Sequence, residues 1–462
     1  MYSDKPHEEC GVFGVWNSNE RPAAQSIYYG LVGLQHRGQE AAGIAVCDTY
    51  GEKDNLCLYK GNGLVSEVFD ANKLATLRGN IGVGHVRYST TGDGRPENIQ
   101  PISFYSVKGT LALVHNGNIV NTGEIRNALA EQGEVFRATS DSEVAAVLIA
   151  RERARCGSIE EAVTRAAPML QGGYAFIIMS PRKLVAVRDP FGLKPLCLGK
   201  TESGWMLASE SCALAAAGAT FVRDIAPGEV LSISRKGLQS TQLQDCGTRA
   251  HCIFEYIYFA RLDSVLDGVS VYSARFRGGQ ALADAYPVEA DIVTGVPESG
   301  LTSAAGYANR AGIPFVHAFY KNSYIGRTFI KPTQEERENA VHMKLSVLAD
   351  AVRGKRVILI DDSIVRGTTI TNLIRMLREA GALQVHVRIS SPPFLYPCFY
   401  GTDVADSTQL LADRFSVQEI CRRIGADSLG YMRLEDLQQM TGALPLCRAC
   451  FEGKYPHKRM KE

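Results

Sequence analysis

The sequence predicts two domains of different fold class, an α+β domain followed by a parallel α/β domain. A chain of 462 residues can fold into two or three domains with complete hydrophobic cores. Up to about residue 235, short β-like runs are interrupted by helical segments, which is typical of an antiparallel sheet covered by helices. From about Cys252, strands alternate with helices, and this order favours a parallel sheet.

The composition argues against several classes of protein. Hydrophobic residues make up 45% of the chain and the net charge is +1, so neither disorder nor a nucleic-acid partner is expected. The sequence has no apolar run long enough to span a membrane, and its first ten residues, MYSDKPHEEC, lack the apolar stretch of a secretory signal. Twelve cysteines in such a chain favour metal or catalytic use over a disulfide framework. We therefore expect a cytoplasmic protein.

The first domain is predicted from β-like runs and helical patterns. The β-like runs cover residues 10–16, 43–46, 81–86, 111–115 and 175–179, and the helical patterns cover 141–155 and 159–169. Periodicity breaks at Gln239, Ser240, Thr241 and Gly247, which places the domain join near residues 240–252. We therefore assign residues 10–245 to the first domain and 246–462 to the second. The part from about Asp403 onward is expected to be mostly helical.

The most informative stretch lies in the second domain, where residues 357–369 read VILIDDSIVRGTT. Four apolar residues end in Asp361 and Asp362, and a loop with Gly367 leads into residues 370–377, whose apolar positions have helical spacing. A helix N-terminus binds phosphate, while paired carboxylates bind ribose hydroxyls or Mg²⁺. An ordinary buried strand with an acidic turn is the alternative, although adjacent carboxylates are a poor choice for a purely structural turn.

This stretch resembles the phosphoribosyl-diphosphate (PRPP) motif of type I phosphoribosyltransferases. The resemblance implies Mg²⁺ as a cofactor, and PRPP binding by Asp361, Asp362, Ser363, Arg366, Gly367, Thr368 and Thr369. Residues 291–300, DIVTGVPESG, form a predicted strand and turn before a helix over 303–311, and they look like the diphosphate loop of that family. In this loop Ser299 is implied as a further contact to Mg²⁺, besides Asp361 and Asp362.

A long polar stretch at residues 320–344 separates these two motifs. It contains Lys321, Arg327, Lys331 and Arg337, so its basic side chains can screen a diphosphate. We interpret the stretch as a lid that orders over bound PRPP, and a solvated surface loop is the alternative.

Four sequence words in the first domain change the interpretation of Cys10, which alone would be read as a small buried apolar residue. Cys10 lies in HEECGVFGVW, and the words that follow it are HRGQE (36–40), GHVRYST (84–90), HNGN (115–118) and TSDSE (139–143). Together they resemble the class II glutamine amidotransferases of the N-terminal-nucleophile hydrolase superfamily. The resemblance implies a four-layer αββα fold for this domain, with Cys10 as the nucleophile.

The same resemblance implies that residues 1–9 are a propeptide. A free α-amine on Cys10, with a pKa near ~8, can act as the base for the adjacent thiol. Asn116 and the Gly117 N–H are implied as the oxyanion hole, and Arg87 and Asp141 as ligands of the glutamine carboxylate and ammonium groups.

Four residues of these words are open to more than one interpretation. Arg37 lies in the word that resembles a loop beside the nucleophile, and we assign it to the glutamine site. His85 and His115 look like acid–base residues in isolation, but a structural role is favoured because the amine supplies the base. Asp141 opens a predicted helix, so it is also a candidate N-cap.

Cys447 and Cys450 form a CxxC pair in the second domain. Such a pair can be a redox centre, half of a zinc site, or two ligands of an iron–sulfur cluster. Cys252 and Cys398 are the candidates that complete four thiolates, with Cys246 as a rival for Cys252, whereas Cys421 lies in a helical pattern and is expected in the core. The order of Cys252, Cys398, Cys447 and Cys450 resembles the iron–sulfur form of the glutamine PRPP amidotransferase family, which implies one 4Fe-4S cluster; zinc is the alternative.

Both resemblances together imply a glutamine-dependent enzyme that passes ammonia to PRPP and forms 5-phosphoribosylamine, the first step of purine nucleotide synthesis. They also imply feedback by AMP and GMP, a homotetramer, and an internal ammonia channel, for which Tyr258 and the region of Ile330 are candidate walls. Another class II amidotransferase is one alternative, and the acidic pair argues against it. A PRPP-sensing regulator without catalysis is the other, and the intact glutaminase residues argue against that.

Overall fold

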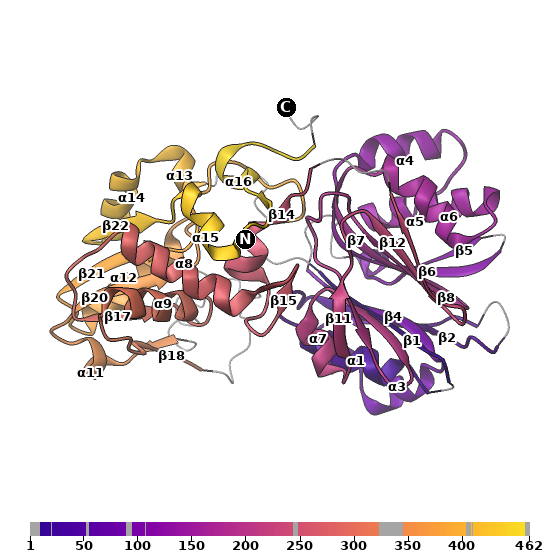
Figure 1. Ribbon diagram of the computed structural model, residues 1–462, viewed down its shortest axis with the longest axis horizontal. Helices are drawn as coiled ribbons and strands as arrows, with labels where there is room; N and C mark the ends of the chain where they lie inside the picture. The colour runs from indigo at the N-terminus through magenta and orange to yellow at the C-terminus, as the bar shows by residue number, and fades with distance from the viewer. Residues whose placement is uncertain are drawn as a thin grey trace.

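The computed structural model shows two domains side by side (Figure 1). It describes residues 10–19, 21–51, 55–88, 95–106, 108–243, 248–322, 345–402, 408 and 410–457. The predicted propeptide, most of the predicted lid and Cys246 lie outside these residues. Within the described residues, no helix is both long and apolar enough to cross a membrane.

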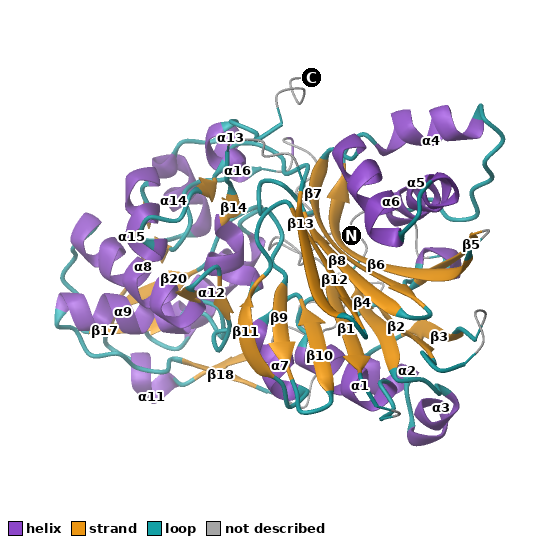
Figure 2. Ribbon diagram, turned by 45° about the vertical axis from the view of Figure 1, so that its right-hand side comes forward, coloured by secondary structure: helices purple, strands orange, loops and turns teal. Residues whose placement is uncertain are grey.

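The first domain contains two antiparallel sheets packed face to face (Figure 2). One sheet has the order β11-β9-β10-β1-β4-β2-β3 and the other has the order β13-β12-β8-β7-β6-β5. The strands of the first sheet are β1 (Gly11–Asn17), β2 (Ala41–Cys47), β3 (Cys57–Asn62), β4 (Ile81–Arg87), β9 (Cys197–Lys200), β10 (Gly204–Ala208) and β11 (Thr220–Asp224). Those of the second sheet are β5 (Ile102–Ser106), β6 (Gly109–Ile119), β7 (Gly172–Ser180), β8 (Lys183–Arg188), β12 (Glu229–Ser234) and β13 (Gly237–Gln242).

Helices cover the outer face of each sheet. The first sheet packs against α1 (Ala24–Gly33) and α7 (Ser211–Ala216), with α2 (Val65–Val68) and α3 (Ala71–Thr76) nearby. The second packs against α5 (Asp141–Arg155) and α6 (Ile159–Ala166), and α4 (Thr122–Ala130) lies on α5. Because both faces of each sheet are buried, central strands such as β7 are apolar almost throughout. The predicted α+β fold with helix, sheet, sheet and helix layers is confirmed.

Two details differ from the sequence prediction. The helix predicted over residues 159–169 is α6 only to Ala166, and a 3₁₀ turn follows at Ala167–Met169, because Pro168 has no N–H to continue an α-helix. Residues 239–241, predicted to break periodicity, belong to β13. This strand lies at the edge of its sheet, where polar side chains face solvent, so it has no apolar pattern.

The second domain is built on a parallel sheet, as predicted. The strand order is β17-β20-β21-β22, with β17 (Ile292–Gly295), β20 (Arg356–Asp361), β21 (Gln384–Ile389) and β22 (Ser428–Tyr431). The helices are α8 (Val271–Ala285), α9 (Leu301–Ala311), α11 (Ala349–Val352), α12 (Thr368–Glu379), α13 (Leu411–Arg414), α14 (Val417–Ile424), α15 (Leu437–Thr441) and α16 (Ala449–Glu452). The apolar positions predicted for α12, Ile370, Leu373, Ile374 and Leu377, are all buried.

Short elements complete the second domain. They are β14 (His251–Cys252), a π-helical turn (Glu255–Phe259), β15 (Val265–Leu266), β16 (Val269–Ser270), β18 (Phe319–Lys321), β19 (Leu345–Val347) and β23 (Leu446–Cys447). The C-terminal part, predicted to be mostly helical, thus also supplies β22 to the sheet and β23 to a pair with β14. This pairing places Cys252 beside Cys447.

Candidate active sites and a four-cysteine pocket

Cys10 lies immediately before β1 and is half-buried. Its thiol donates a hydrogen bond to the Tyr88 carbonyl at 3.5 Å. Since Gly11 pairs with Val86 across β1 and β4, the end of β4 brings Arg87 to the nucleophile. Burial raises the pKa of the Cys10 thiol to about 11, and Arg87 opposes this shift. A thiol in this environment needs a base to become a nucleophile at neutral pH.

The predicted oxyanion residues lie within β6. Asn116 is fully buried, and among the described residues neither polar atom of its side chain has a hydrogen-bond partner. Gly117 has a φ of 136°, and a Cβ there would lie 2.0 Å from the Gly173 carbonyl oxygen, so only glycine fits. A buried amide without a partner is costly, by about 1–3 kcal/mol, which is reasonable where a ligand supplies the missing hydrogen bond.

Asp141 is the first residue of α5 and is almost fully buried. The N-cap interpretation of Asp141 is wrong, because Ser140 is the N-cap and accepts the Glu143 N–H. The Asp141 carboxylate instead accepts the Ile119 N–H at 3.0 Å, which ties α5 to β6 two residues beyond Gly117. Asp141 also acts electrostatically on the Cys10 thiol.

The two histidines of this region have structural surroundings. His85 and His115 are both buried, and burial lowers the pKa of His85 to about 3 and also lowers the pKa of His115. One ring nitrogen of His85 lies 3.1 Å from the His115 carbonyl oxygen, and one of His115 lies 3.1 Å from Ser142 Oγ. Burial thus disfavours the charged form of both rings, and each ring has a hydrogen-bond partner within the domain.

Arg37 lies in the junction between the domains. Its side chain is fully buried and donates to Glu210 in the first domain and to Glu255 in the π-helical turn of the second. The same Glu210 carboxylate accepts hydrogen bonds from the Arg261 N–H at 2.9 Å and from Ser264 Oγ at 2.6 Å. The prediction that Arg37 binds glutamine is therefore replaced by a structural role. Glu210 and Glu255 lie 173 and 218 residues away in the sequence, so the local word could not indicate them.

The second candidate site lies at the carboxyl edge of the parallel sheet. Asp361 ends β20, and Ser299 donates to Asp362, so the predicted diphosphate loop and the acidic pair do meet. The loop is held against β20 by the Val296 N–H, which donates to the Ile360 carbonyl at 2.8 Å. A Cβ on Gly300 would lie 2.3 Å from the same carbonyl oxygen, so glycine is required for this close approach.

The N-terminus of α12 faces the same edge. Gly367 is its N-cap with a φ of 88°, and no side chain caps the helix. Arg366 and Thr369 are half-buried and Thr368 is exposed. An N-terminus without a side-chain cap leaves backbone N–H groups for an anion, and the helix dipole adds to the attraction.

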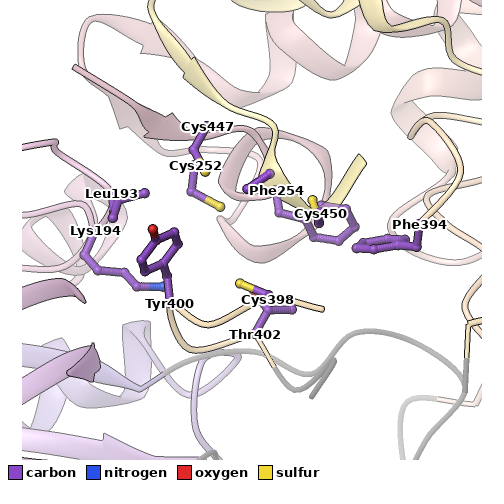
Figure 3. A pocket seen from close by; sticks show the side chains of 11 residues that line it. Leu193, Lys194, Cys252, Phe254, Phe394, Cys398, Tyr400, Thr402, Cys447 and Cys450 are labelled. Atoms are coloured by element: carbon purple, nitrogen blue, oxygen red, sulfur yellow. The ribbon is translucent and has the colours of Figure 1, made fainter. Parts of the chain in front are cut away.

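The four predicted cluster cysteines line one pocket (Figure 3). The other walls of the pocket include Leu193 and Lys194 from the first domain and Phe394 and Tyr400 from the second. Cys252, Cys398, Cys447 and Cys450 reach it from separate parts of the chain. Cys421 lies on α14, and its thiol donates to the Ala426 carbonyl, so it takes no part in the pocket.

The lining of the pocket offers four sulfur donors to a metal group. Four cysteine thiolates are the donor set of both a tetrahedral zinc site and an iron–sulfur cluster. Burial raises the pKa of Cys252 and Cys447 to about 12, so thiolates here need a positive partner. The four thiols fit a multi-iron cluster, and the buried Lys194 adds a positive charge.

Comparisons with known proteins agree with both halves of this description. Residues 85–216 match the glutamine amidotransferase domain, and residues 279–390 match the phosphoribosyl transferase domain. The chain is 47% identical to the amidophosphoribosyltransferase of Bacillus subtilis over 457 residues, which cover 97% of this chain and 94% of that relative. It is 46% identical to the amidophosphoribosyltransferase of Methanocaldococcus jannaschii over 462 residues, 97% of each chain.

The chain belongs to the amidophosphoribosyltransferase family. The solved structure of the B. subtilis glutamine PRPP amidotransferase complexed with ADP and GMP superposes with a TM-score of 0.89 at 46% identity, covering 97% of both chains. The chain is therefore a pentosyltransferase that uses glutamine to aminate PRPP in purine nucleotide synthesis.

Glu255 and Lys194 are among the buried charged residues that the sequence analysis did not identify. Glu255 interrupts the apolar run IFEYIYF, and Lys194 lies between Leu193 and Pro195 in FGLKPL. A single charge inside an apolar run is a signal for a buried ion pair or a buried site. That signal does not identify the partner, which comes from another part of the chain.

Proposed function

We propose that Cys10 releases ammonia from glutamine and that this ammonia displaces diphosphate from PRPP inside the same enzyme. The Cys10 sulfur attacks the side-chain amide carbon of glutamine, the C–N bond breaks and ammonia leaves. Water then cleaves the thioester to free glutamate. At the second site a bond forms between the ammonia nitrogen and ribose C1, while the bond from C1 to diphosphate breaks. The observation that supports this best is the buried Asn116 amide beside Gly117, which has no hydrogen-bond partner within the described part of the chain.

Each glutaminase residue has a proposed task. The Asn116 side chain and the Gly117 N–H stabilise the oxyanion, Arg87 binds the glutamine carboxylate, and Asp141 binds its ammonium group. Removal of residues 1–9 supplies the α-amine of Cys10 as the base, which this thiol needs because its pKa is raised.

The second site binds PRPP through its charges. The proposed Mg²⁺ contacts are Asp361, Asp362 and Ser299, and Mg²⁺ neutralises the leaving diphosphate when bound. Two carboxylates suffice, because Mg²⁺ in such sites takes its other ligands from substrate phosphates and water. The 5-phosphate lies on the turn from Arg366 to Thr369 at the N-terminus of α12.

The four-cysteine pocket is the proposed site of one 4Fe-4S cluster, held by Cys252, Cys398, Cys447 and Cys450. When bound, the cluster supplies a covalent cross-link between three parts of the second domain and no electron transfer to the reaction. The support is the convergence of four thiols on one pocket with a buried lysine in its wall.

The proposed enzyme is regulated by purine nucleotides and assembles into an oligomer. The B. subtilis relative was solved with ADP and GMP bound, and we extend nucleotide binding to this chain, with AMP and GMP as feedback inhibitors. A homotetramer in the cytoplasm is the proposed state of the enzyme, and size-exclusion chromatography with light scattering tests the assembly.

Glutamate release from glutamine, measured anaerobically with and without PRPP and Mg²⁺, tests the coupled reaction. Cys10→Ala should abolish glutamine hydrolysis but keep PRPP amination from added ammonium salts. Cys57→Ala is the matched control, because Cys57 is a half-buried cysteine in β3. Hydrolysis that persists in Cys10→Ala, or that ignores PRPP, would refute the proposal. The intact mass of the purified enzyme reports the loss of residues 1–9.

Iron and sulfide analysis tests the cluster. About four of each per chain are expected from a 4Fe-4S cluster, with Cys398→Ser losing them and Cys421→Ser keeping them. One zinc per chain, or iron retained in Cys398→Ser, would contradict the assignment.

A further inference from the structure

The segment that carries Cys398 contacts the strand that carries the oxyanion residues. The Asn118 side-chain amide donates to the Phe399 carbonyl at 2.9 Å, although these residues lie 281 positions apart. Phe399 follows Cys398 directly, and Asn118 follows Gly117 directly. A single hydrogen bond therefore links the wall of the cysteine pocket to the strand of the glutaminase site.

A second contact lies on the neighbouring strand. Gly172 pairs with Ile119 across β6 and β7, and the Gly172 N–H donates to His457 Nε2 at 3.2 Å. Burial lowers the pKa of His457 to about 4, so Nε2 is an unprotonated acceptor at physiological pH. The His457 ring packs on Tyr400, a wall residue of the cysteine pocket, with ring centroids 5.6 Å apart. In Figure 1 the yellow C-terminal segment runs across the junction toward the first domain.

A third contact comes from the first-domain wall of the pocket. Leu193 lines the pocket, and its Cβ lies 3.0 Å from where a Cβ on Gly173 would be. The Gly173 carbonyl in turn closes the space beside Gly117. Two hydrogen bonds and one close approach thus join the surroundings of the pocket to residues of β6 and β7 that lie beside Gly117. Gly117 itself has a φ of 136°, which must be maintained for its N–H to keep its direction.

We propose that Asn118 is a positioning residue that couples the four-cysteine pocket to the oxyanion hole. By holding β6 to the Cys398 segment, it keeps the Gly117 N–H and the Asn116 amide aimed at the glutamine carbonyl. This inference rests on the proposed roles of Asn116 and Gly117. It adds that the state of the cysteine pocket controls glutamine hydrolysis through the strand, without any group of the pocket touching glutamine.

The test compares Asn118→Asp with Asn121→Asp. Asn121 is the matched control, because its side chain also donates to a backbone carbonyl, that of Met169 at 2.9 Å, but does not reach the cysteine segment. For Asn118→Asp we expect kcat of glutamine hydrolysis to fall about tenfold with KM nearly unchanged, since losing a whole oxyanion donor costs ~100-fold and misalignment costs less. PRPP amination from ammonium salts should stay within about twofold of the unmodified enzyme. Asn118→Ala, which adds no charge near the Phe399 carbonyl, should behave in the same way.

A spectroscopic measurement tests the coupling in the other direction. If Asn118 holds β6 to the Cys398 segment, a covalent adduct of Cys10 with an electrophilic glutamine analogue, which fills the glutamine site, should slow the loss of iron–sulfur absorbance in air. This protection should disappear in Asn118→Asp and persist in Asn121→Asp. Several outcomes would overturn the inference. In the kinetic test, these are an unchanged kcat in both Asn118 variants, an equal fall of kcat in Asn121→Asp, or a change in KM alone. In the spectroscopic test, it is protection of the absorbance that persists in Asn118→Asp. Hydrolysis that survives in Cys10→Ala would instead refute the proposed function on which it rests.

Discussion

The two halves of the chain place their functional groups on different kinds of scaffold. In the first domain, Asn116 and Arg87 belong to antiparallel strands, and both side chains are buried. In the second domain, the acidic pair and the N-terminus of α12 lie where parallel strands end and loops begin. Thr368, the first residue of α12, is exposed, in contrast to the fully buried Asn116, whereas Asp361 and Asp362 are themselves buried.

The polar groups of the two sites are therefore expected to act in different ways, one in the transition state and the other in substrate binding. A donor fixed on a buried strand needs no reorganisation during the reaction, and its hydrogen bond is strong because water is excluded. Groups on an open edge can receive a large, highly charged substrate and then contribute mainly to its binding. Substitutions of the proposed oxyanion donors in the first site should therefore lower kcat, whereas those at the open edge, apart from the proposed metal contacts, should raise KM.

The largest effect is expected at the metal contacts of the open edge. Asp362→Asn keeps the shape of the side chain but removes the charge that contacts Ser299 and is proposed to hold Mg²⁺, so PRPP amination should fall on the order of 1000-fold. Asp291→Asn is the control, because Asp291 lies at the opposite end of the same strands and pairs with Arg356. Steady-state rates with ammonium salts as nitrogen donor measure both. Equal losses of PRPP amination in Asp362→Asn and Asp291→Asn would mean that the carboxyl edge of the sheet has no special role in the reaction.

A second prediction concerns the junction that belongs to neither site. Arg37→Met leaves the Glu210 and Glu255 carboxylates buried without their shared cation, which should lower the free energy of unfolding by about 3 kcal/mol. Urea denaturation followed by circular dichroism measures the change. The double variant in which Glu255→Gln accompanies Arg37→Met should recover part of the loss. If Arg37→Met were as stable as the unmodified enzyme and its KM for glutamine were raised, the result would support the glutamine-binding role predicted from the sequence.

The sequence was informative wherever one short segment carries the whole signal. Asp361, Asp362 and α12 follow each other within one strand, loop and helix, so a local pattern predicts them. The pair Cys447 and Cys450 is equally local. Arg37 shows the limit, because its buried partners come from two distant segments and only the fold brings them together. The contact of Asn118 with Phe399 could not be predicted for the same reason. Its acceptor is a backbone carbonyl, which every residue has, so the sequence around Phe399 does not indicate it.

The buried strand of the first site gives the third prediction. Asn116→Ala removes one proposed oxyanion donor and should lower kcat of glutamine hydrolysis about 100-fold, with KM for glutamine little changed. Folding should not suffer, because the amide has no partner to lose among the described residues. Initial rates of glutamate release and a thermal melt measure the two effects. A stability loss without a kcat effect would mean that Asn116 is a packing residue.

The smallest effect is expected where the open edge meets solvent. Thr368→Ala removes one exposed hydroxyl from the proposed phosphate turn, and a neutral hydrogen bond contributes about 1 kcal/mol, so KM for PRPP should rise about fivefold at unchanged kcat. Thr371→Ala is the control, because the Thr371 hydroxyl donates to the Gly367 carbonyl at 2.8 Å and is already engaged. If Thr368→Ala lowered kcat and left KM unchanged, the open edge would be acting on the transition state as the buried strand does. The two sites would then not differ in the way proposed, with the glutamine site stabilising the transition state and the PRPP site mainly binding substrate. Thr368 would in that case have to become buried when PRPP binds.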